Sequence, residues 1–417
     1  MSNNKAILVA IDRGDFNVDE SLEELELLSK SIGIYPIERI IQRRAFVDPR
    51  WYLGRGKIEK LAKIVGAFDI GYVIIDDEIT AQQKRNIEDI TQAEVLDRTQ
   101  VILEIFAKHA SSEEGKIQVE LAKLQYELPR MIGIGKELSR LGGGIGTRGP
   151  GEQILQRKRS VIKKRISILK KKLEDIKKER GIQKRKRISG DLYRVSIVGY
   201  TNSGKSSLLN VLSKREDAKV ANELFATLQP ITRRVKLPSG KVILVSDTVG
   251  FIRKLPHTII EAFKTTLEEI KDSDLLIHVV DISDPFFETK IRESMKVLKE
   301  IDADKIPRVM LFNKIDLIPK EVIEETMERF PDALFSSVKN GIGILEILEK
   351  IEDELSSLED TVRCLVPVDK IGRIYSLLDR ISVKEQKLLD GKFELVLKGR
   401  RELISEAIGK IEGEVLG

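Results

Sequence analysis

A glycine-rich segment at residues 199–206 constrains the fold more than any other part of this 417-residue chain. It reads G-x-x-x-x-G-K-S, follows an apolar run at residues 195–198, and precedes residues 206–212, which we expect to be helical. A strand, such a loop and a helix in this order form a phosphate-binding loop. Its residues are Gly199, Tyr200, Thr201, Asn202, Ser203, Gly204, Lys205 and Ser206. We expect backbone N–H groups to surround the β-phosphate, Lys205 to bridge the β- and γ-phosphates, and Ser206 to bind Mg²⁺.

Two further motifs, each at the end of an apolar run, predict the base and a second metal contact. Residues 242–246 precede the D-x-x-G motif, which consists of Asp247, Thr248, Val249 and Gly250. We expect Asp247 to hold Mg²⁺ through water and the Gly250 N–H to contact the γ-phosphate. The N-K-x-D motif consists of Asn313, Lys314, Ile315 and Asp316. A carboxylate such as Asp316 accepts from guanine N1–H and N2–H₂ together, a donor pair that adenine lacks, so the three motifs predict a GTPase.

Apolar residues recur at heptad spacing on both sides of a glycine-rich stretch at residues 141–151. The first series is Ile117, Leu121, Leu124, Leu128 and Met131, and the second is Leu155, Ile162, Ile166, Leu169, Leu173 and Ile176. Such spacing is typical of paired helices, and the glycines would interrupt a helix. The pattern therefore predicts an antiparallel helical hairpin with a glycine-rich tip.

Positive charge is concentrated in the second half of this hairpin. Residues 157–187 contain 16 Lys and Arg and 3 acidic residues, a net charge of +13 in a chain whose total is +5. A field of this kind suits a polyanionic partner, and we favour nucleic acid over a merely solvated helix. Anionic lipid is the other polyanion to consider, but the basic helix lacks Trp and Phe.

The remaining sequence predicts a multidomain α/β protein. We expect an N-terminal parallel α/β domain (1–112), the basic hairpin (113–190), a Ras-like P-loop GTPase domain (191–356) and a small C-terminal α+β domain (357–417). The last has strand-like runs at residues 362–368 and 393–397 and helical runs at 373–381 and 401–411. The single cysteine, Cys364, reads as a core residue, and the three histidines have no metal-ligand spacing. The sequence has neither an 18-residue apolar run nor a signal-peptide pattern, so we expect a cytoplasmic protein that is not stably inserted in a membrane. Peripheral contact with a membrane is still possible under this expectation, and we expect the protein to be a monomer.

The sequence resembles the HflX family of GTPases over nearly its whole length. The resemblance rests on the strings YLGRGK (52–57), DRT (97–99), LGGGIGTRGPGE (141–152), FATL (225–228) and DTVGFIRKLP (247–256), together with the phosphate-binding loop. It implies binding to the ribosome, mainly to the large subunit and its rRNA, and in bacteria ribosome splitting. It also implies that Ser206 and Thr227 are Mg²⁺ ligands.

The resemblance also assigns two nucleotide-contacting segments. The first switch corresponds to Phe225, Ala226, Thr227, Leu228 and Gln229, where the family pattern F-A-T-L-D ends in Asp instead of Gln. The guanine-contacting loop corresponds to Ser337, Val338 and Lys339, in place of the usual S-A-K. With these assignments, Lys205, Thr227 and Gly250 are the candidate catalytic residues.

The residue after D-x-x-G predicts how hydrolysis is controlled. Ras-like enzymes place there a glutamine that orients the attacking water, whereas this chain has Phe251. We therefore expect slow basal hydrolysis and stimulation by the ribosome. Asn202 suggests a potassium ion beside the phosphates, although an equally good reading is that it braces the first switch. A GTP-gated RNA-binding adaptor without catalysis and a membrane-associated regulatory GTPase are the alternatives.

Overall fold

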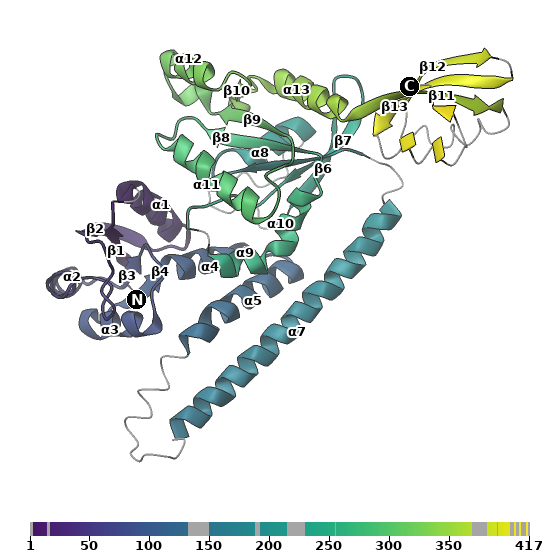
Figure 1. Ribbon diagram of the computed structural model, residues 1–417. Coiled ribbons are helices and arrows are strands. Elements are labelled where there is room, and N and C mark those ends of the chain that lie inside the picture. The colour runs from purple at the N-terminus through teal and green to yellow at the C-terminus, as the bar shows by residue number, and fades with distance from the viewer. Residues whose placement is uncertain are drawn as a thin grey trace.

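The computed structural model describes residues 3–14, 17–131, 150–187, 192–214, 230–254, 256–368, 382–389 and 391–400, together with 404–405, 408–409 and 414–415. Two sheets, one parallel and one mostly parallel, lie next to each other, and a long helical hairpin runs beside them (Figure 1). An antiparallel sheet lies at one end of the molecule. This arrangement confirms the predicted α/β class. In the described residues no helix is long and apolar enough to cross a membrane.

The N-terminal sheet is parallel throughout and is covered by helices on both faces. Its strands, in spatial order, are β2 (Tyr35–Arg43), β1 (Lys5–Asp12), β3 (Tyr72–Ile75) and β4 (Glu94–Asp97). The helices are α1 (Val18–Ser31), α2 (Arg55–Phe68), α3 (Ala81–Thr91) and α4 (Arg98–His109). Alternate residues of a strand face opposite sides, so Leu8 packs with α1 and α4 whereas Ile7 packs with α2 and α3.

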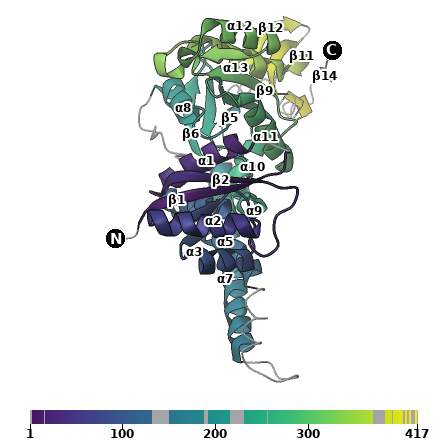
Figure 2. The same cartoon turned by 90° about the vertical axis from the view of Figure 1, so that its left-hand side faces the viewer.

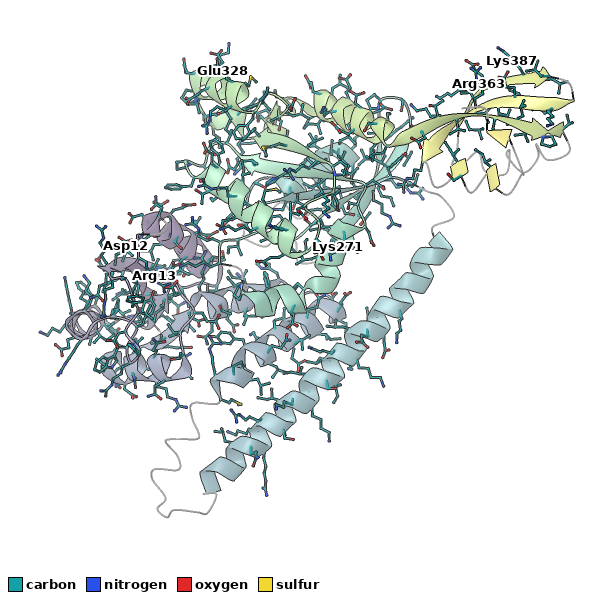
Figure 3. The ribbon with its side chains drawn as sticks, in the orientation of Figure 1. Asp12, Arg13, Lys271, Glu328, Arg363 and Lys387 are labelled. Carbon is teal, nitrogen blue, oxygen red and sulfur yellow. The ribbon has the colours of Figure 1, made fainter. Side chains whose placement is uncertain are left out.

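The predicted hairpin is formed by α5 (Glu113–Arg130) and α7 (Pro150–Arg187), which lie side by side and antiparallel (Figure 1). Their seam contains the predicted apolar positions Ile117, Leu121, Leu169 and Leu173, all buried. Arg165 on α7 also pairs with Glu120 on α5, at 2.6 Å. Lys170, Lys171 and Lys172 are exposed, and side chains of α7 project away from the seam into solvent (Figure 3). The glycine-rich tip at 141–149 lies outside the described residues.

The GTPase-like domain has a six-stranded sheet in which only the edge strand β6 runs antiparallel. The spatial order is β10 (Leu334–Ser336), β9 (Arg308–Asn313), β8 (Leu275–Asp281), β5 (Arg194–Gly199), β7 (Val242–Asp247) and β6 (Ile231–Lys236). The helices are α8 (Lys205–Ser213), α9 (His257–Ala262), α10 (Lys264–Lys271), α11 (Phe287–Glu300), α12 (Lys320–Arg329) and α13 (Ile344–Ser357), with short 3₁₀ turns η1 (Ile315–Leu317) and η2 (Val338–Asn340). The carboxyl ends of β5, β8 and β9 meet at one edge, where ligands bind in such sheets.

The C-terminal part is an antiparallel sheet joined directly to α13. Its order is β12 (Ser382–Leu389), β13 (Lys392–Arg400), β11 (Glu359–Pro367) and β14 (Glu414–Val415). Cys364 is fully buried in its core, as expected. The helix predicted at 373–381 lies outside the described residues, and of the one predicted at 401–411 the described pairs 404–405 and 408–409 are helical.

The N-terminal and GTPase-like domains share one apolar core. Leu25 of α1, Phe106 of α4 and Tyr126 of α5 belong to the same buried cluster as Ile252 and Phe263 of the GTPase-like domain. The rings of Phe106 and Phe263 pack edge to face with their centroids 4.8 Å apart. Figure 2 shows the N-terminal sheet beneath the six-stranded sheet, with α1 between them. The two sheets are therefore held together by side-chain packing and not only by the connecting chain.

Candidate nucleotide site

The phosphate-binding loop begins where β5 ends and stops where α8 begins, as the motif predicts. At two positions of this loop, no residue other than glycine would fit without a change of the backbone or of its neighbours. A Cβ at Gly199 (φ 145°) would lie 2.2 Å from the Val279 carbonyl oxygen, and one at Gly204 (φ 99°) would lie 2.2 Å from the Asn313 Nδ2 atom. The loop is thus pressed against β8 and against the N-K-x-D motif. The N-terminus of α8, with its free N–H groups, follows directly, and such a helix end favours a bound anion.

Lys205 is buried at the first position of α8, and its ammonium donates a 2.7 Å hydrogen bond to the Tyr200 carbonyl oxygen. Burial lowers the pKa of Lys205 to about 8, although the Asp247 carboxylate opposes this shift. A Cβ at Gly250 would lie 2.9 Å from the Lys205 Nζ atom, so only glycine fits there. The D-x-x-G glycine and the phosphate-binding lysine therefore lie next to each other.

The two described Mg²⁺ candidates are in direct contact. The Ser206 hydroxyl donates a 2.6 Å hydrogen bond to the Asp247 Oδ2 atom, which is at the end of β7. Asp247 has no exposed surface. A hydroxyl and a buried carboxylate at one point suit Mg²⁺, which prefers oxygen ligands. The third candidate, Thr227, lies outside the described residues with the rest of the predicted first switch, Phe225, Ala226, Leu228 and Gln229.

The N-K-x-D motif ties the phosphate-binding loop to the predicted guanine loop. The Asn313 side chain donates to the Ser203 carbonyl oxygen (2.9 Å) and accepts from the Val338 N–H (3.1 Å). Ser337, which is buried, donates a 2.6 Å hydrogen bond to the Asp316 carboxylate. Both predicted guanine-reading segments are therefore adjacent, and Asn313 links them to the phosphate site.

One partner of this motif was not predicted from the sequence. Lys314 has a left-handed backbone (φ 69°), and its ammonium lies 2.5 Å from the Asp281 carboxylate at the end of β8. Asp281 could have been suspected, because it ends an apolar strand at the same edge as the three motifs. Its contact holds the Lys314 ammonium at the carboxyl end of β8.

Phe251, the residue in place of the water-orienting glutamine, is buried with Tyr200, Leu267 and Ile270. Its backbone pairs with the phosphate-binding loop: its N–H donates to the Gly199 carbonyl (3.0 Å), and its carbonyl accepts from the Thr201 N–H (2.9 Å). Phe251 therefore anchors the segment after D-x-x-G to the core.

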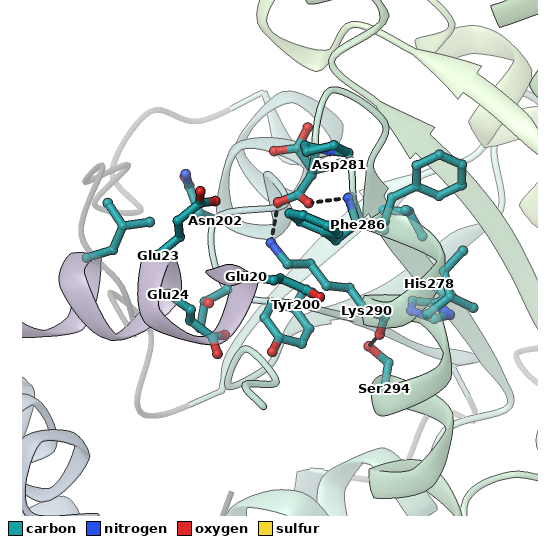
Figure 4. Close-up of a pocket in the computed structure, with 18 residues that line it drawn as sticks. Glu20, Glu23, Glu24, Tyr200, Asn202, His278, Asp281, Phe286, Lys290 and Ser294 are labelled. Atoms are coloured by element: carbon teal, nitrogen blue, oxygen red, sulfur yellow. Dashed lines mark hydrogen bonds and ion pairs between the residues drawn. The ribbon is translucent and has the colours of Figure 1, made fainter. Parts of the chain in front are cut away.

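A cavity of about 140 Å³ opens between the phosphate-binding loop and α1 (Figure 4). Glu20, Glu23 and Glu24 line it from α1, and Lys290 from α11 faces them next to Asp284. Asn202 lies at its rim with a left-handed backbone (φ 62°). His278 on β8 also lines it, and burial lowers the pKa of this imidazole to about 4. Among the described residues, no three or more His, Cys, Asp or Glu side chains form a group that could hold a metal ion.

A glycine-rich loop at the carboxyl edge of a parallel sheet, next to D-x-x-G and N-K-x-D motifs, defines a P-loop GTPase. Family models agree: one described as "GTP-binding GTPase N-terminal" matches residues 19–107, "GTP-binding GTPase Middle Region" matches 109–187, and "50S ribosome-binding GTPase" matches 194–314. The chain belongs to the HflX family, and it is an enzyme that binds and hydrolyses GTP.

Relatives of this family match along nearly the whole chain. GTPase HflX of Caldanaerobacter subterraneus subsp. tengcongensis is 45% identical over 382 residues, covering 92% of this chain and 88% of the relative. GTPase HflX of Escherichia coli K12 is 35% identical over 407 residues, covering 97% and 95%. The crystal structure of a GTP-binding protein from the hyperthermophilic archaeon Sulfolobus solfataricus in complex with GDP is 26% identical, covers 84% of this chain and 98% of that one, and has a TM-score of 0.42.

Proposed function

We propose that this GTPase binds the large ribosomal subunit and that GTP binding and hydrolysis control its attachment. The observation that carries the proposal is the basic character of α7: residues 157–187 have a net charge of +13, and among them Lys163, Lys164, Lys170, Lys171 and Lys172 are exposed. A rigid helix presenting many lysines suits the phosphates of rRNA. The family model that matches residues 194–314 is described as a 50S ribosome-binding GTPase, which supports the same partner. The working unit is a monomer in the cytoplasm.

Four units share this task, with boundaries proposed at 1–112, 113–190, 191–356 and 357–417. In the third unit, Lys205 binds the β- and γ-phosphates, and the Gly250 N–H binds the γ-phosphate. Ser206, Thr227 and Asp247 hold Mg²⁺, which when bound neutralises charge on the phosphate oxygens. The Ser206–Asp247 contact of 2.6 Å supports this assignment, because it brings two of the oxygen donors together.

Hydrolysis without a partner is slow in this proposal. The side chain of Phe251 is buried and cannot donate or accept a hydrogen bond, so it does not orient the attacking water. We infer that the ribosome stimulates hydrolysis by supplying a polar group to the attacking water. Measuring GTP turnover with and without large subunits tests this step, and an unchanged rate would contradict it.

A potassium ion beside Asn202 would supply positive charge to the phosphates in the transition state. Asn202 is exposed, belongs to the phosphate-binding loop and lines the cavity beside it. We expect faster hydrolysis in potassium than in sodium at equal ionic strength, and loss of this difference in Asn202→Ala. Equal rates of the wild type in the two salts would leave Asn202 with a bracing role only.

Co-sedimentation with purified 50S subunits, 30S subunits and anionic liposomes tests the proposed partner. We expect binding to 50S subunits with a non-hydrolysable GTP analogue, and weaker binding with GDP. Incubation with 70S ribosomes followed by a sucrose gradient tests splitting, which would appear as separate subunits. Sedimentation with liposomes and not with 50S subunits would favour a membrane-associated GTPase, and equal binding with both nucleotides would contradict control by GTP.

A further inference from the structure

The chain segment around Gly250 packs into the core of the N-terminal sheet. Ile252 is 2% exposed, and Val249 is 8% exposed. Both belong to the apolar cluster formed by β1, α1, α4 and α5. This segment contains the D-x-x-G glycine, which moves with the γ-phosphate in GTPases of this class. Any displacement of residues 249–254 therefore requires repacking of the N-terminal core.

Arg98 fastens the same segment by hydrogen bonds from inside that core. Its side chain is 2% exposed, and its Nε atom donates to the Arg253 carbonyl oxygen at 3.2 Å. Its Nη1 atom donates to the Asp76 carboxylate at 2.8 Å and to the Ser21 carbonyl at 3.3 Å, and its Nη2 atom pairs with Glu24. Because its three nitrogen atoms all have partners, the planar Arg98 guanidinium is held in a single orientation. It therefore fixes where the backbone at residue 253 lies.

The side chains of residues 253 and 254 attach to the same domain. Arg253 pairs with Glu20 of α1 at 3.1 Å. Lys254 has a left-handed backbone (φ 52°), and its ammonium lies 2.7 Å from both Asp76 and Asp77, just after β3. Because Asp76 binds both Arg98 and Lys254, the contacts form one network.

Asp97, the residue before Arg98, is hydrogen-bonded to the hairpin helix α5. Asp97 has no exposed surface, and its Oδ2 atom accepts from the Tyr126 hydroxyl at 2.6 Å and from Arg130 at 3.3 Å. Both donors are on α5. Asp97 is also the N-cap of α4, with its Oδ1 atom accepting from the Gln100 N–H at 2.9 Å. Its backbone position is therefore coupled to that of Arg98, the first residue of the helix.

A continuous chain of contacts thus joins the hairpin to the phosphate-binding loop. It runs from Tyr126 on α5 through Asp97 and Arg98 to the Arg253 backbone. Two residues before Arg253, the Phe251 backbone is hydrogen-bonded to Gly199 and Thr201. A second link is direct, because Gln125 on α5 donates to Glu261 on α9 at 3.1 Å. A shift of α5 alone would weaken the hydrogen bonds from Tyr126 and Arg130 to the buried Asp97 carboxylate. Because a buried carboxylate without these bonds is unfavourable in free energy, Asp97 is expected to move with α5.

We propose that Asp97 and Arg98 are positioning residues that couple the position of hairpin helix α5 to the conformation of residues 250–254, and hence to GTP hydrolysis. Neither residue touches the nucleotide, so both act through the backbone of the D-x-x-G segment. The inference rests on the GTPase activity and not on the identity of the hairpin's partner. It is tested without ribosomes, so a failure of ribosome binding would leave it intact.

The sharpest variant is Tyr126→Phe, which removes one hydroxyl and keeps the ring in the core. Its matched control is Tyr193→Phe, because the Tyr193 hydroxyl also donates to a carboxylate, that of Glu359, at 3.1 Å and far from Asp97. In the full chain we expect Tyr126→Phe to speed amide hydrogen exchange at residues 250–254 about fivefold and to lower kcat about threefold. KM should stay within about twofold, because the ground-state phosphate contacts remain. The control should change neither quantity.

Arg98→Lys gives an independent test, since a single ammonium cannot reach all the partners of the guanidinium. We expect the same pattern, and we expect the double variant with Tyr126→Phe to be no worse than the more affected single variant. If Arg98→Lys does not fold, the Tyr126→Phe measurement still decides. Faster exchange within α5 alone, with residues 250–254 and kcat as in the wild type, would overturn the proposal. So would multiplicative effects in the double variant.

Discussion

The Ser337 hydroxyl, directly after β10, donates a 2.6 Å hydrogen bond to the carboxylate of Asp316, which lies in η1 after β9. Ser337 is buried and Asp316 is exposed, so a buried hydroxyl restricts the orientation of a carboxylate at the surface. A carboxylate that accepts two hydrogen bonds from one base edge must lie in the plane of that base. If Asp316 binds guanine as predicted, we expect the serine to contribute to guanine recognition through the aspartate.

Replacing Ser337 by alanine should weaken GTP and GDP binding to the same extent. The expected loss is about tenfold, or about 1.4 kcal/mol, the value of one hydrogen bond to a charged group. Titration of a fluorescent guanine nucleotide measures it. Because the hydroxyl does not contact phosphate, a loss confined to GTP would contradict this role.

Asp316→Asn should exchange the base specificity. The asparagine N–H₂ group would face guanine N2–H₂ as donor against donor, whereas xanthine has a carbonyl at that position, which can accept a hydrogen bond from the amide. We expect GTP affinity to fall at least about a hundredfold, about 2.7 kcal/mol, and xanthosine triphosphate to bind in its place. Competition between the two nucleotides measures the change. Unchanged GTP affinity would mean that another group reads the base.

Phe251→Gln should not restore a Ras-like mechanism. The side chain at this position is 2% exposed and packs in the core, so an amide there would be buried away from the nucleotide. We expect destabilisation of about 2–4 kcal/mol, from the poorer packing and the buried amide, and no gain in GTP turnover. Thermal unfolding and hydrolysis assays measure both, with Phe251→Leu as the apolar control. A tenfold faster variant would show that residue 251 reaches the water.

The three nucleotide motifs were predictable because each is contiguous and follows an apolar strand. Likewise, alternating and heptad patterns predicted the N-terminal sheet and the hairpin. Contacts between distant residues were not predictable in this way. Arg98 and Arg253 are 155 positions apart, and no local pattern distinguishes a buried arginine from a solvated one. The burial of Ile252 in the N-terminal core could not be predicted for the same reason, since most of the cluster around it comes from β1, α1, α4 and α5, which are distant in the sequence.

His278 should make stability depend on pH. Burial holds the pKa of this imidazole at about 4, well below the usual value near 6.5. Between these values the unfolded chain binds more protons, so this stabilisation is present above about pH 6.5 and is lost as the pH falls toward 4. From about pH 7 to about pH 5 the loss is about 2 kcal/mol. We expect His278→Leu to show a smaller decrease in melting temperature than the wild type over this range, and equal decreases would contradict the assignment.

The basic surface of α7 can be tested without removing the helix. Deleting the whole hairpin is a poor test, because Val119, Ala122 and Tyr126 of α5 belong to the N-terminal core. Substituting exposed lysines avoids this damage, so we choose Lys171→Gln with Lys172→Gln. The matched control is Lys299→Gln with Lys320→Gln, which removes the same charge from exposed positions of the GTPase-like domain.

If these α7 lysines bind rRNA phosphates, the double substitution lowers affinity for 50S subunits and makes its salt dependence shallower. The slope of log K against log salt is negative. For each phosphate that a lysine no longer neutralises, its magnitude decreases by about 0.7–0.9, because fewer counterions are released on binding. GTP affinity should not change, since α7 and the nucleotide site are separate. Binding measured over a range of potassium chloride concentrations gives both slopes. A weaker complex with an unchanged slope would mean that α7 binds ribosomal protein, and equal effects of the two variant pairs would mean that only net charge matters.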